Sequence, residues 1–337
     1  MKSKNWYIKQ IKRKPVQITR YTVQAIFLFF MLYVGVEFYQ FYMHFASGGE
    51  TPFVERPAAV EGFLPVSALL ASKVWLSIGE FDTIHPAGLV LFSFFVGGAI
   101  IFRRSFCSWI CPVGTVGEWV GRLGKKIFGR NFEIPTWLAW LLTPIKYIIL
   151  FFFISMVFAM PVYGAIEFLN QPYNKISDVK MLLFFLNIGV VGIIVVGSLF
   201  VLSLFFKNFW CRFLCPYGAL IGLGSIFRIS KVRRNEETCT NCEMCTKVCP
   251  SRITVHKVET VNSLNCNACM ACVEACPIKD TLEMTVVNKK VSKWFIPVAF
   301  LVAFFLVVTF AKITGHWETL ISYEEWKFLI PLADEIK

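Results

Sequence analysis

The amino-acid sequence predicts an all-α integral membrane protein with about five membrane-spanning helices, an internal two-helix repeat and one small α+β insert. Of its 337 residues, 56% are hydrophobic and 17% are charged, whereas about a quarter of the residues of an ordinary soluble domain are charged. Several apolar stretches are long enough to cross a bilayer, and eight of the twelve cysteines lie in residues 239–277. Together these observations exclude an ordinary soluble globular protein.

Five apolar stretches approach the length of about 20 residues that a spanning helix needs. They cover residues 22–42, 86–102, 137–160, 181–206 and 294–311. The first stretch follows a basic N-terminus, as a signal peptide would. Its apolar run is too long for a signal peptide, however, and no small-residue cleavage site follows it, so we expect a retained span. A shorter apolar run, 66–78, predicts a helix in the outer membrane interface.

The charges of the connecting segments predict which side of the membrane each segment faces. Residues 1–21 carry seven basic and no acidic residues, 103–136 carry six and two, and 207–293 carry thirteen and seven. By contrast, 43–85 carry two basic and five acidic residues, and 312–337 carry three and five. Because basic loops stay in the cytoplasm, we expect the N-terminus inside and the C-terminus outside. The net charge of +12 then reflects topology and not nucleic-acid binding.

This order of segments predicts three regions along the chain. Residues 1–206 form a membrane domain with four spans. Residues 207–293 form a cytoplasmic segment, within which about 236–285 make up the α+β domain. Residues 294–337 form the fifth span and an outer tail.

The sequence also repeats itself at an offset of 104 residues. Residues 102–114 (FRRSFCSWICPVG) align with residues 206–218 (FKNFWCRFLCPYG). Each copy follows a predicted span, so the repeated unit is expected to be a two-helix hairpin. The proline after each cysteine pair should open a helix, since proline is tolerated at the first helical position. The cysteines that should lie at equal depth are Cys107, Cys111, Cys211 and Cys215.

Residues 239–277 contain two copies of the spacing Cys-x2-Cys-x2-Cys-x3-Cys-Pro. This is the spacing of bacterial two-cluster ferredoxins, in which the fourth cysteine of each run ligates the other cluster. One [4Fe–4S] cluster is therefore expected on Cys239, Cys242, Cys245 and Cys276. The other is expected on Cys266, Cys269, Cys272 and Cys249. Zinc also binds sets of four cysteines, but the doubled run with both prolines favours iron and sulfide. Disulfides are disfavoured in the reducing cytoplasm.

The four repeated cysteines at the membrane boundary predict a shared redox or metal site. Each pair with its proline copies the second half of a ferredoxin run. The alternative is that these residues are buried small apolar side chains, as free cysteine often is. The repeated pattern favours soft thiolate ligation, including a further iron–sulfur centre. The four residues are Cys107, Cys111, Cys211 and Cys215.

These motifs resemble those of the polytopic membrane ferredoxins, a family that includes NapH, the membrane part of NosR, CcoG and especially the YccM-type electron-transport proteins. The likeness to the YccM type covers nearly the whole chain, including residues 56–65 (RPAAVEGFLP), His85 and the five-span layout. The resemblance implies a protein of the bacterial cytoplasmic (inner) membrane that moves electrons between the quinone pool and redox partners. The chain lacks the periplasmic flavin domain of NosR and the extra C-terminal domain of CcoG. A flavoprotein, a cytochrome or a terminal reductase is therefore expected as partner.

We expect electron transfer of the quinol dehydrogenase type, with quinone as the substrate. The alternative is a metal-centre assembly factor that reduces copper or iron or delivers it to a respiratory enzyme. The absence of Met- or His-rich copper motifs favours electron transfer. The sequence also contains no motif for covalent haem, no glycine-rich dinucleotide fingerprint and no P-loop.

Four ionisable residues are candidates for handling quinol and its protons. Lys146 lies about nine residues into its span, and an intramembrane charge is a functional candidate by default, although it could instead snorkel to the interface. Quinol bound near Lys146 could give its proton to Glu118 by general-base chemistry. His85 and Glu61 mark an alternative site at the other membrane face, across an apolar core about 30 Å thick. Because electrons would need a relay to cross that core, we favour the inner site.

Overall fold

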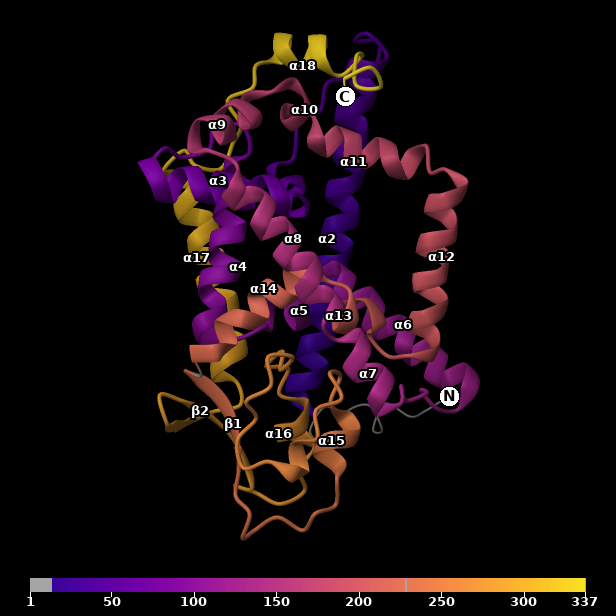
Figure 1. Cartoon of the computed structure of the whole chain (residues 1–337), viewed down its shortest axis with the longest axis vertical. Helices are drawn as coiled ribbons and strands as arrows, with labels where there is room; N and C mark the ends of the chain where they lie inside the picture. Colours follow the sequence, from indigo (N-terminus) through magenta and orange to yellow (C-terminus); the bar gives the residue numbers. More distant parts are fainter. Residues whose placement is uncertain (1–13, 228, 337) are drawn as a thin grey trace. The chain divides into compact units, whose positions relative to one another are not determined.

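The computed structural model describes residues 14–227 and 229–336 (Figure 1). The chain divides into two compact units, each built from three separate stretches. Unit 1 comprises Met1–Leu28, Phe95–Ile148 and Ser198–Ala303. Unit 2 comprises Phe29–Phe94, Ile149–Gly197 and Phe304–Lys337. The unit boundaries fall within several long helices, so each of these helices contributes residues to both units.

Helices make up most of both units (Figure 1). The helices of the predicted spans are α2 (Pro15–Ala46), α4 (Pro86–Phe102), α7 (Thr136–Leu142), α8 (Ile145–Ala159), α11 (Ser177–Leu186), α12 (Val190–Phe205) and α17 (Phe295–Ile313). The other helices outside the ferredoxin-like domain are α3 (Pro65–Ile78), α5 (Ser105–Trp109), α6 (Pro112–Phe128), α9 (Val162–Asn170), α10 (Pro172–Lys175), α13 (Phe209–Phe213), α14 (Pro216–Gly224) and α18 (Tyr323–Leu329). Pro112 and Pro216 open α6 and α14, which confirms the prediction for the proline after each cysteine pair.

In the part of the chain that the structure describes, three helical segments are long and apolar enough to cross a membrane. They are Pro15–Ala46, Thr136–Ala159 and Phe295–Ile313. The predicted span 181–206 is not one straight helix, because α11 and α12 meet at an angle of 84°. Its straight part, α12, has 16 residues and is therefore about 24 Å long. α4 is apolar but has only 17 residues. The chain is a membrane protein, and its described residues contain three candidate spans by length and composition, or four if the bent pair is one span, so the expected five are not confirmed.

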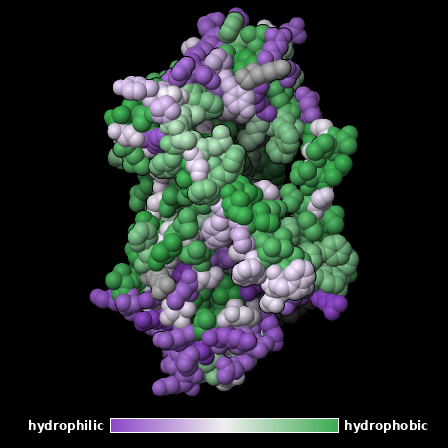
Figure 2. Space-filling model, viewed as in Figure 1, coloured by the Kyte–Doolittle hydropathy of each residue, from purple (hydrophilic) through white to green (hydrophobic). Residues whose placement is uncertain are grey.

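The exposed surfaces of these helices are apolar. Figure 2 shows hydrophobic side chains over α12, where Val190, Val191 and Ile194 are each at least 60% exposed. Exposed apolar surface of this extent marks a surface that contacts something other than water, and lipid is the natural contact for these helices. Hydrophilic side chains cover the strands and loops of the α+β domain in the same view.

The α+β domain lies in unit 1. Strands β1 (Ser230–Arg234), β2 (Leu282–Val286) and β3 (Lys289–Val291) form an antiparallel sheet in the order β1-β2-β3. The register pairs Ser230 with Val286. Val287 and Asn288 join β2 to β3 with φ of 46° and 62°, as a type I′ hairpin turn requires. Between β1 and β2 the chain forms two five-residue helices, α15 (Met244–Val248) and α16 (Ala271–Ala275).

Unit 2 has a core of its own. Aromatic side chains of α2 pack there against α18, and the ring of Phe41 meets that of Trp326 edge-on at a centroid distance of 5.5 Å. α3, the helix expected in the outer interface, packs against α9. Its left-handed C-cap, Gly79, ends the helix as glycine commonly does.

Candidate iron–sulfur sites

The eight cysteines of the α+β domain line two separate cavities in unit 1. One cavity is lined by Cys239, Cys242, Cys245 and Cys276. The other is lined by Cys249, Cys266, Cys269 and Cys272. In each cavity, three cysteines come from one run and the fourth comes from the other run. These are the two sets that the crossed ligand pattern of two-cluster ferredoxins requires.

The backbone of each run bends in the same way around its middle cysteine. Asn241 and Glu243 flank Cys242 with φ of 51° and 59°. The corresponding residues of the second run, Ala268 and Met270, have φ of 46° and 59°. A left-handed conformation at a residue other than glycine costs about 1–3 kcal/mol and persists mainly at functional sites and ligand clamps. Both loops therefore have a backbone conformation suited to placing three thiols around one bound group.

The chemistry of these thiols also fits a bound cluster. Burial raises the pKa of Cys249 to about 12, with Cys269 adding to the rise. Without a bound cation this side chain is a neutral thiol, whereas iron keeps a coordinating thiol deprotonated. Sulfur ligands of this softness suit iron–sulfur clusters. The residues present therefore fit the expected group.

The two Cys-x3-Cys-Pro segments have the same order of elements around their cysteines. The short helices α5 and α13 carry Cys107 and Cys211, and the second cysteine of each pair is the N-cap of the next helix, α6 or α14. The amide of Cys111 donates to the carbonyl of Phe106 at 3.0 Å, and that of Cys215 donates to Trp210 at 3.0 Å. The hydrogen bonds of both copies are thus related by the offset of 104 residues.

The glycine that follows each proline is needed for close packing. A Cβ atom on Gly114 would lie 2.3 Å from the carbonyl oxygen of Cys107, and one on Gly218 would lie 2.7 Å from Nη2 of Arg104. Both distances are shorter than Cβ contacts allow. Gly114 therefore lets α6 fold back on Cys107, and Gly218 lets α14 pack against Arg104 of the other segment.

The four membrane-boundary thiols interact electrostatically. Burial raises the pKa of Cys111 to about 12, with further increases from Cys107 and Cys215. Burial also raises the pKa of Cys211 well above its usual value, and the other three cysteines add to the rise. The structure thus brings together the two pairs expected to share a site. Within residues 14–227 and 229–336, however, no group of three His, Cys, Asp or Glu side chains has the geometry of a single-ion site.

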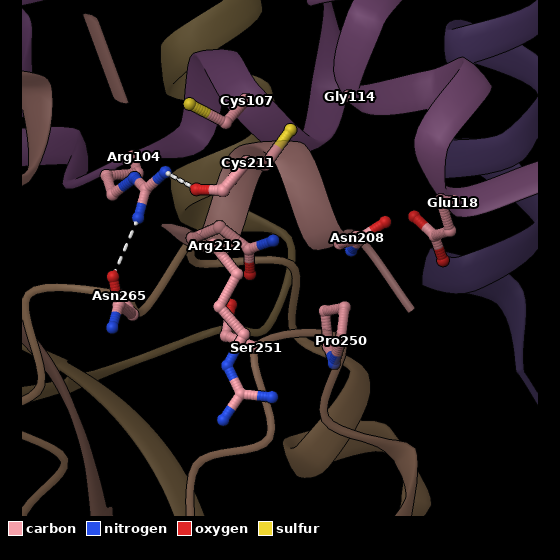
Figure 3. A pocket seen from close by; sticks show the side chains of 11 residues that line it. Arg104, Cys107, Gly114, Glu118, Asn208, Cys211, Arg212, Pro250, Ser251 and Asn265 are labelled. Carbon is pink, nitrogen blue, oxygen red and sulfur yellow. Dashed lines mark hydrogen bonds between the residues drawn. The ribbon is translucent and has the colours of Figure 1, made fainter. Parts of the chain in front are cut away.

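Two cationic side chains meet beside these thiols. The guanidinium of Arg104 donates to the Cys211 carbonyl at 3.4 Å and to Oδ1 of Asn265 at 3.1 Å (Figure 3). The ammonium of Lys146 donates to the same Asn265 oxygen at 2.6 Å. Lys146 is fully buried, so the predicted intramembrane lysine lies next to the predicted cysteine site. Arg104 was not singled out from the sequence, although it stands three residues before Cys107.

The loop that carries Cys266 is bound to the first Cys-x3-Cys-Pro segment. Asn265 and Asn267 flank Cys266, and the Asn267 carbonyl accepts a hydrogen bond from the hydroxyl of Ser108 at 2.7 Å. Arg103, fully buried, donates to the carbonyls of Val261 and Ser263 at 3.1 and 2.8 Å. The second set of ferredoxin cysteines is therefore attached to the membrane cysteines through hydrogen bonds on both sides of Cys266.

Glu118 does not have the environment of a proton acceptor. Its two oxygens accept a bidentate pair of hydrogen bonds from Arg20, both at 2.8 Å, and one from Arg122 at 2.9 Å. Burial works against the charge, but the Arg20 guanidinium outweighs it and lowers the pKa of Glu118 to about 2. A carboxylate this acidic is a weak general base, so the geometry favours a structural role for it.

His85 and Glu61, the alternative pair, lie together in unit 2. Nδ1 of His85 is 3.6 Å from Oε1 of Glu61, and both side chains are buried. Arg56 joins them, because its guanidinium donates to Glu61 at 2.7 Å and to Asp178 at 2.7 Å. Asp178 was not identified from the sequence, since nothing in the pattern links it to residues more than 90 positions earlier.

The fold and the site together define a class: membrane proteins with a ferredoxin domain attached to cysteine pairs at the membrane boundary. A family model described as a 4Fe-4S binding domain matches residues 84–131 and again 188–234. A second, described as a 4Fe-4S dicluster domain, matches residues 231–277. No solved structure matches the chain.

Curated relatives identify the family. The YccM protein of Escherichia coli (strain K12) is 38% identical over 94% of this chain and 91% of its own length. The methylamine utilization ferredoxin-type protein MauN of Methylorubrum extorquens is 30% identical over 59% of each chain. The regulatory protein NosR of Stutzerimonas stutzeri is 27% identical over 55% of this chain and 24% of its own. The chain belongs to the ferredoxin-type family of membrane electron-transport proteins that includes YccM, and the resemblance noted from its motifs is confirmed.

Proposed function

We propose that this iron–sulfur protein carries electrons from the quinol pool of the membrane to a redox partner. In this proposal two [4Fe–4S] clusters occupy the cysteine sets of residues 239–277, and they supply one-electron chemistry when bound. The observation that carries the proposal is the attachment of the Cys266 loop to the Cys107 segment through Asn265 and Ser108. This attachment links a membrane-boundary thiol site directly to the ferredoxin domain.

The exposure of the cysteines supports a direction for partner binding. Cys242 is exposed, whereas Cys249 and Cys269 are buried. The set that contains Cys242 is therefore the one that a soluble partner can approach. The set that contains Cys269 is the more deeply buried of the two.

We further propose that the four membrane-boundary cysteines hold a third iron–sulfur centre. The family model that matches both segments describes 4Fe-4S binding, and Arg104 and Lys146 supply positive charge beside the thiols. The alternative function, delivery of copper or iron by an assembly factor, has less support. The absence of Met- or His-rich copper motifs in the sequence favours electron transfer over this alternative.

The proposed location is the cytoplasmic membrane of a bacterium, with the N-terminus and the ferredoxin domain inside and the C-terminus in the periplasm. The loop charges support this orientation through the positive-inside rule. Residues 1–13, which hold most of the N-terminal basic charge, lie outside the described residues.

Anaerobic purification followed by iron and sulfide analysis tests the proposal. We expect acid-labile sulfide in amounts equal to iron, and electron paramagnetic resonance signals of reduced clusters that appear when a quinol is added. Zinc without sulfide would contradict the cluster assignment. Clusters that dithionite reduces and no quinol does would contradict the proposed donor.

A further inference from the structure

Unit 1 contains a cavity of about 420 Å³ that none of the roles described above uses. This volume lies in the range of pockets that bind small molecules. The cavity opens between the start of α2, the helix α6, the turn that follows α12 and the two helices of the ferredoxin domain. Its lining includes Lys14, Gln17, Ile18, Arg20, Tyr21, Glu118, Lys207, Val248, Ala271, Glu274 and Ala275. We call it the interfacial cavity.

Most polar groups in this lining are already paired. Arg20 is paired with Glu118, and Glu274 accepts hydrogen bonds from the backbone amides of Val16 and Gln17. Apart from Lys14, which is exposed, two groups are different: within the part of the chain that the structure describes, neither the Lys207 ammonium nor the Tyr21 hydroxyl has a hydrogen-bond partner. A partly buried polar group without a partner costs free energy, so a ligand that accepts from both would be stabilised.

The positions of these two groups are fixed by their surroundings. The guanidinium of Arg122 lies over the Tyr21 ring at 3.7 Å and that of Arg20 lies near it at 4.7 Å. The stem of Lys207 passes over Gly121, where a Cβ atom would come within 3.2 Å of its Cγ. The absence of a side chain at Gly121 thus makes room for Lys207. Two donors held in place at one cavity are typical of a preorganised binding site.

The apolar part of the lining lies close to the cluster ligands in the sequence. Val248 and Ala271 directly precede Cys249 and Cys272, which belong to the same predicted cluster. In the sequence, Tyr21 and Lys207 are the residues just outside the apolar stretches 22–42 and 181–206. The cavity therefore lies at a membrane boundary, where a ligand with a lipid-soluble tail can enter it.

We infer that the interfacial cavity binds the head group of a membrane quinone, with Lys207 and Tyr21 donating hydrogen bonds to its oxygens. This inference rests on the proposed function and moves the expected quinol site away from Lys146, whose ammonium is already bonded to Asn265. A quinone ring has oxygens at opposite ends and an apolar body, which matches two separated donors and an apolar wall. The acceptors of the electrons in the proposed function would be the iron–sulfur clusters.

Photoaffinity labelling with an azidoquinone tests this assignment on the full-length protein in detergent, without any turnover. We expect saturable labelling of peptides that contain residues 14–21 or 207–212. Lys207→Met should raise the quinone concentration needed to displace the label about tenfold or more. Tyr21→Phe should raise it about threefold to tenfold, as the loss of one hydrogen bond implies. Lys126→Met, which removes an exposed lysine of α6, should leave competition unchanged. Unaltered iron content would show that the variants fold.

Three outcomes would overturn the assignment. Labelling confined to the peptides of α8 or α4 would place quinone elsewhere and leave the proposed function standing. Label displaced by phosphatidylglycerol and not by quinone would identify the cavity as a lipid site. Absence of saturable labelling, together with clusters that no quinol reduces, would reject quinol as the donor as well.

Discussion

One nitrogen of the His85 imidazole is held protonated by a hydrogen bond, and the other can gain or lose a proton. Nε2 lies 2.7 Å from the carbonyl oxygen of Asn174, which can only accept, so Nε2 carries a proton. Nδ1 faces Glu61 at 3.6 Å and Nη2 of Arg56 at 3.4 Å. Burial lowers the pKa of His85, but the Glu61 carboxylate outweighs that effect and the net shift is upward. Nδ1 is therefore the atom that gains and loses the proton.

This raised pKa predicts a pH dependence of stability. The folded protein binds the proton more tightly than an unfolded chain whose histidine has the ordinary pKa of 6.5. The stabilisation is therefore fully present below about pH 6.5 and is lost as pH rises through the folded pKa of His85. We expect the Tm of the detergent-solubilised protein to fall over that range. His85→Gln should flatten the dependence, and an equally steep fall in the variant would contradict the assignment.

Asn265 provides a second test at the scale of single residues. Asn265→Leu removes the oxygen that accepts from both Arg104 and Lys146, and it leaves two buried cations short of a partner. The expected cost is about 1–3 kcal/mol in the free energy of unfolding, measured by denaturation in detergent. Asn265→Asp keeps an acceptor between the two cations and should be tolerated. Equal loss of stability in both variants would argue against the bridge.

Single residues show how far sequence reasoning reaches. Lys146 and His85 stood out because each is an ionisable residue within or beside an apolar stretch. The sequence also pairs Glu61 with His85, but it does not identify Asn265 or Asp178, because those contacts depend on folding: Asn265 is 119 residues from Lys146, and Arg56 reaches Asp178 across 122 residues. For the same reason Glu118 looked like a free base, since its partner Arg20 is 98 residues away.

At the scale of elements, the two ferredoxin runs exchange their fourth cysteines, and this exchange can be tested with paired variants. Cys242→Ser with Cys276→Ser should remove one cluster, because both residues line the same cavity. Cys242→Ser with Cys249→Ser should remove both clusters, because Cys249 lines the other cavity. Iron analysis should therefore show a loss of about four irons in the first variant and about eight in the second. The reverse pattern would mean that each run holds its own cluster.

The matched geometry of the Cys-x3-Cys-Pro segments leads to a separate prediction. Replacement of Cys107 or Cys211 by serine should abolish the same spectroscopic centre and leave the two ferredoxin signals intact. The reason is that the thiols of both segments lie within electrostatic reach of one another. Electron paramagnetic resonance of the reduced variants provides the measurement. Unchanged metal content and unchanged spectra would show that these cysteines only fill space.

At this scale, cysteine spacing and proline position predict where elements begin, whereas the length of an apolar stretch does not predict a straight helix. The starts of α6 and α14 follow from Pro112 and Pro216, because proline suits the first helical position. The bend between α11 and α12 could not be anticipated, since residues 181–206 form one continuous apolar stretch. It occurs at residues 187–189, where Asn187 caps the end of α11 and Gly189 precedes α12.

At the scale of the whole molecule, the loop charges predict a single orientation in the membrane. Reporter fusions after Asp178, Asn288 and Lys337 should report outside, inside and outside. The physical reason is that basic segments resist transfer across the membrane. A reporter at Lys337 that lies inside would mean that one of the shorter or bent helices does not cross. The fusion after Asn288 serves as the control, because the ferredoxin cysteines precede it.

Unit 1 is built from three distant stretches of the chain, so it can be completed only late in synthesis. Cys107 and Cys111 emerge early, but the unit is complete only when residue 303 has been made. At roughly 5–20 residues per second, the ribosome needs roughly 10–40 s to cover that distance. During this interval the first thiol pair exists without the loop that binds Arg103 and Arg104. Loading of iron and sulfide into a finished unit can therefore begin only when translation is nearly over.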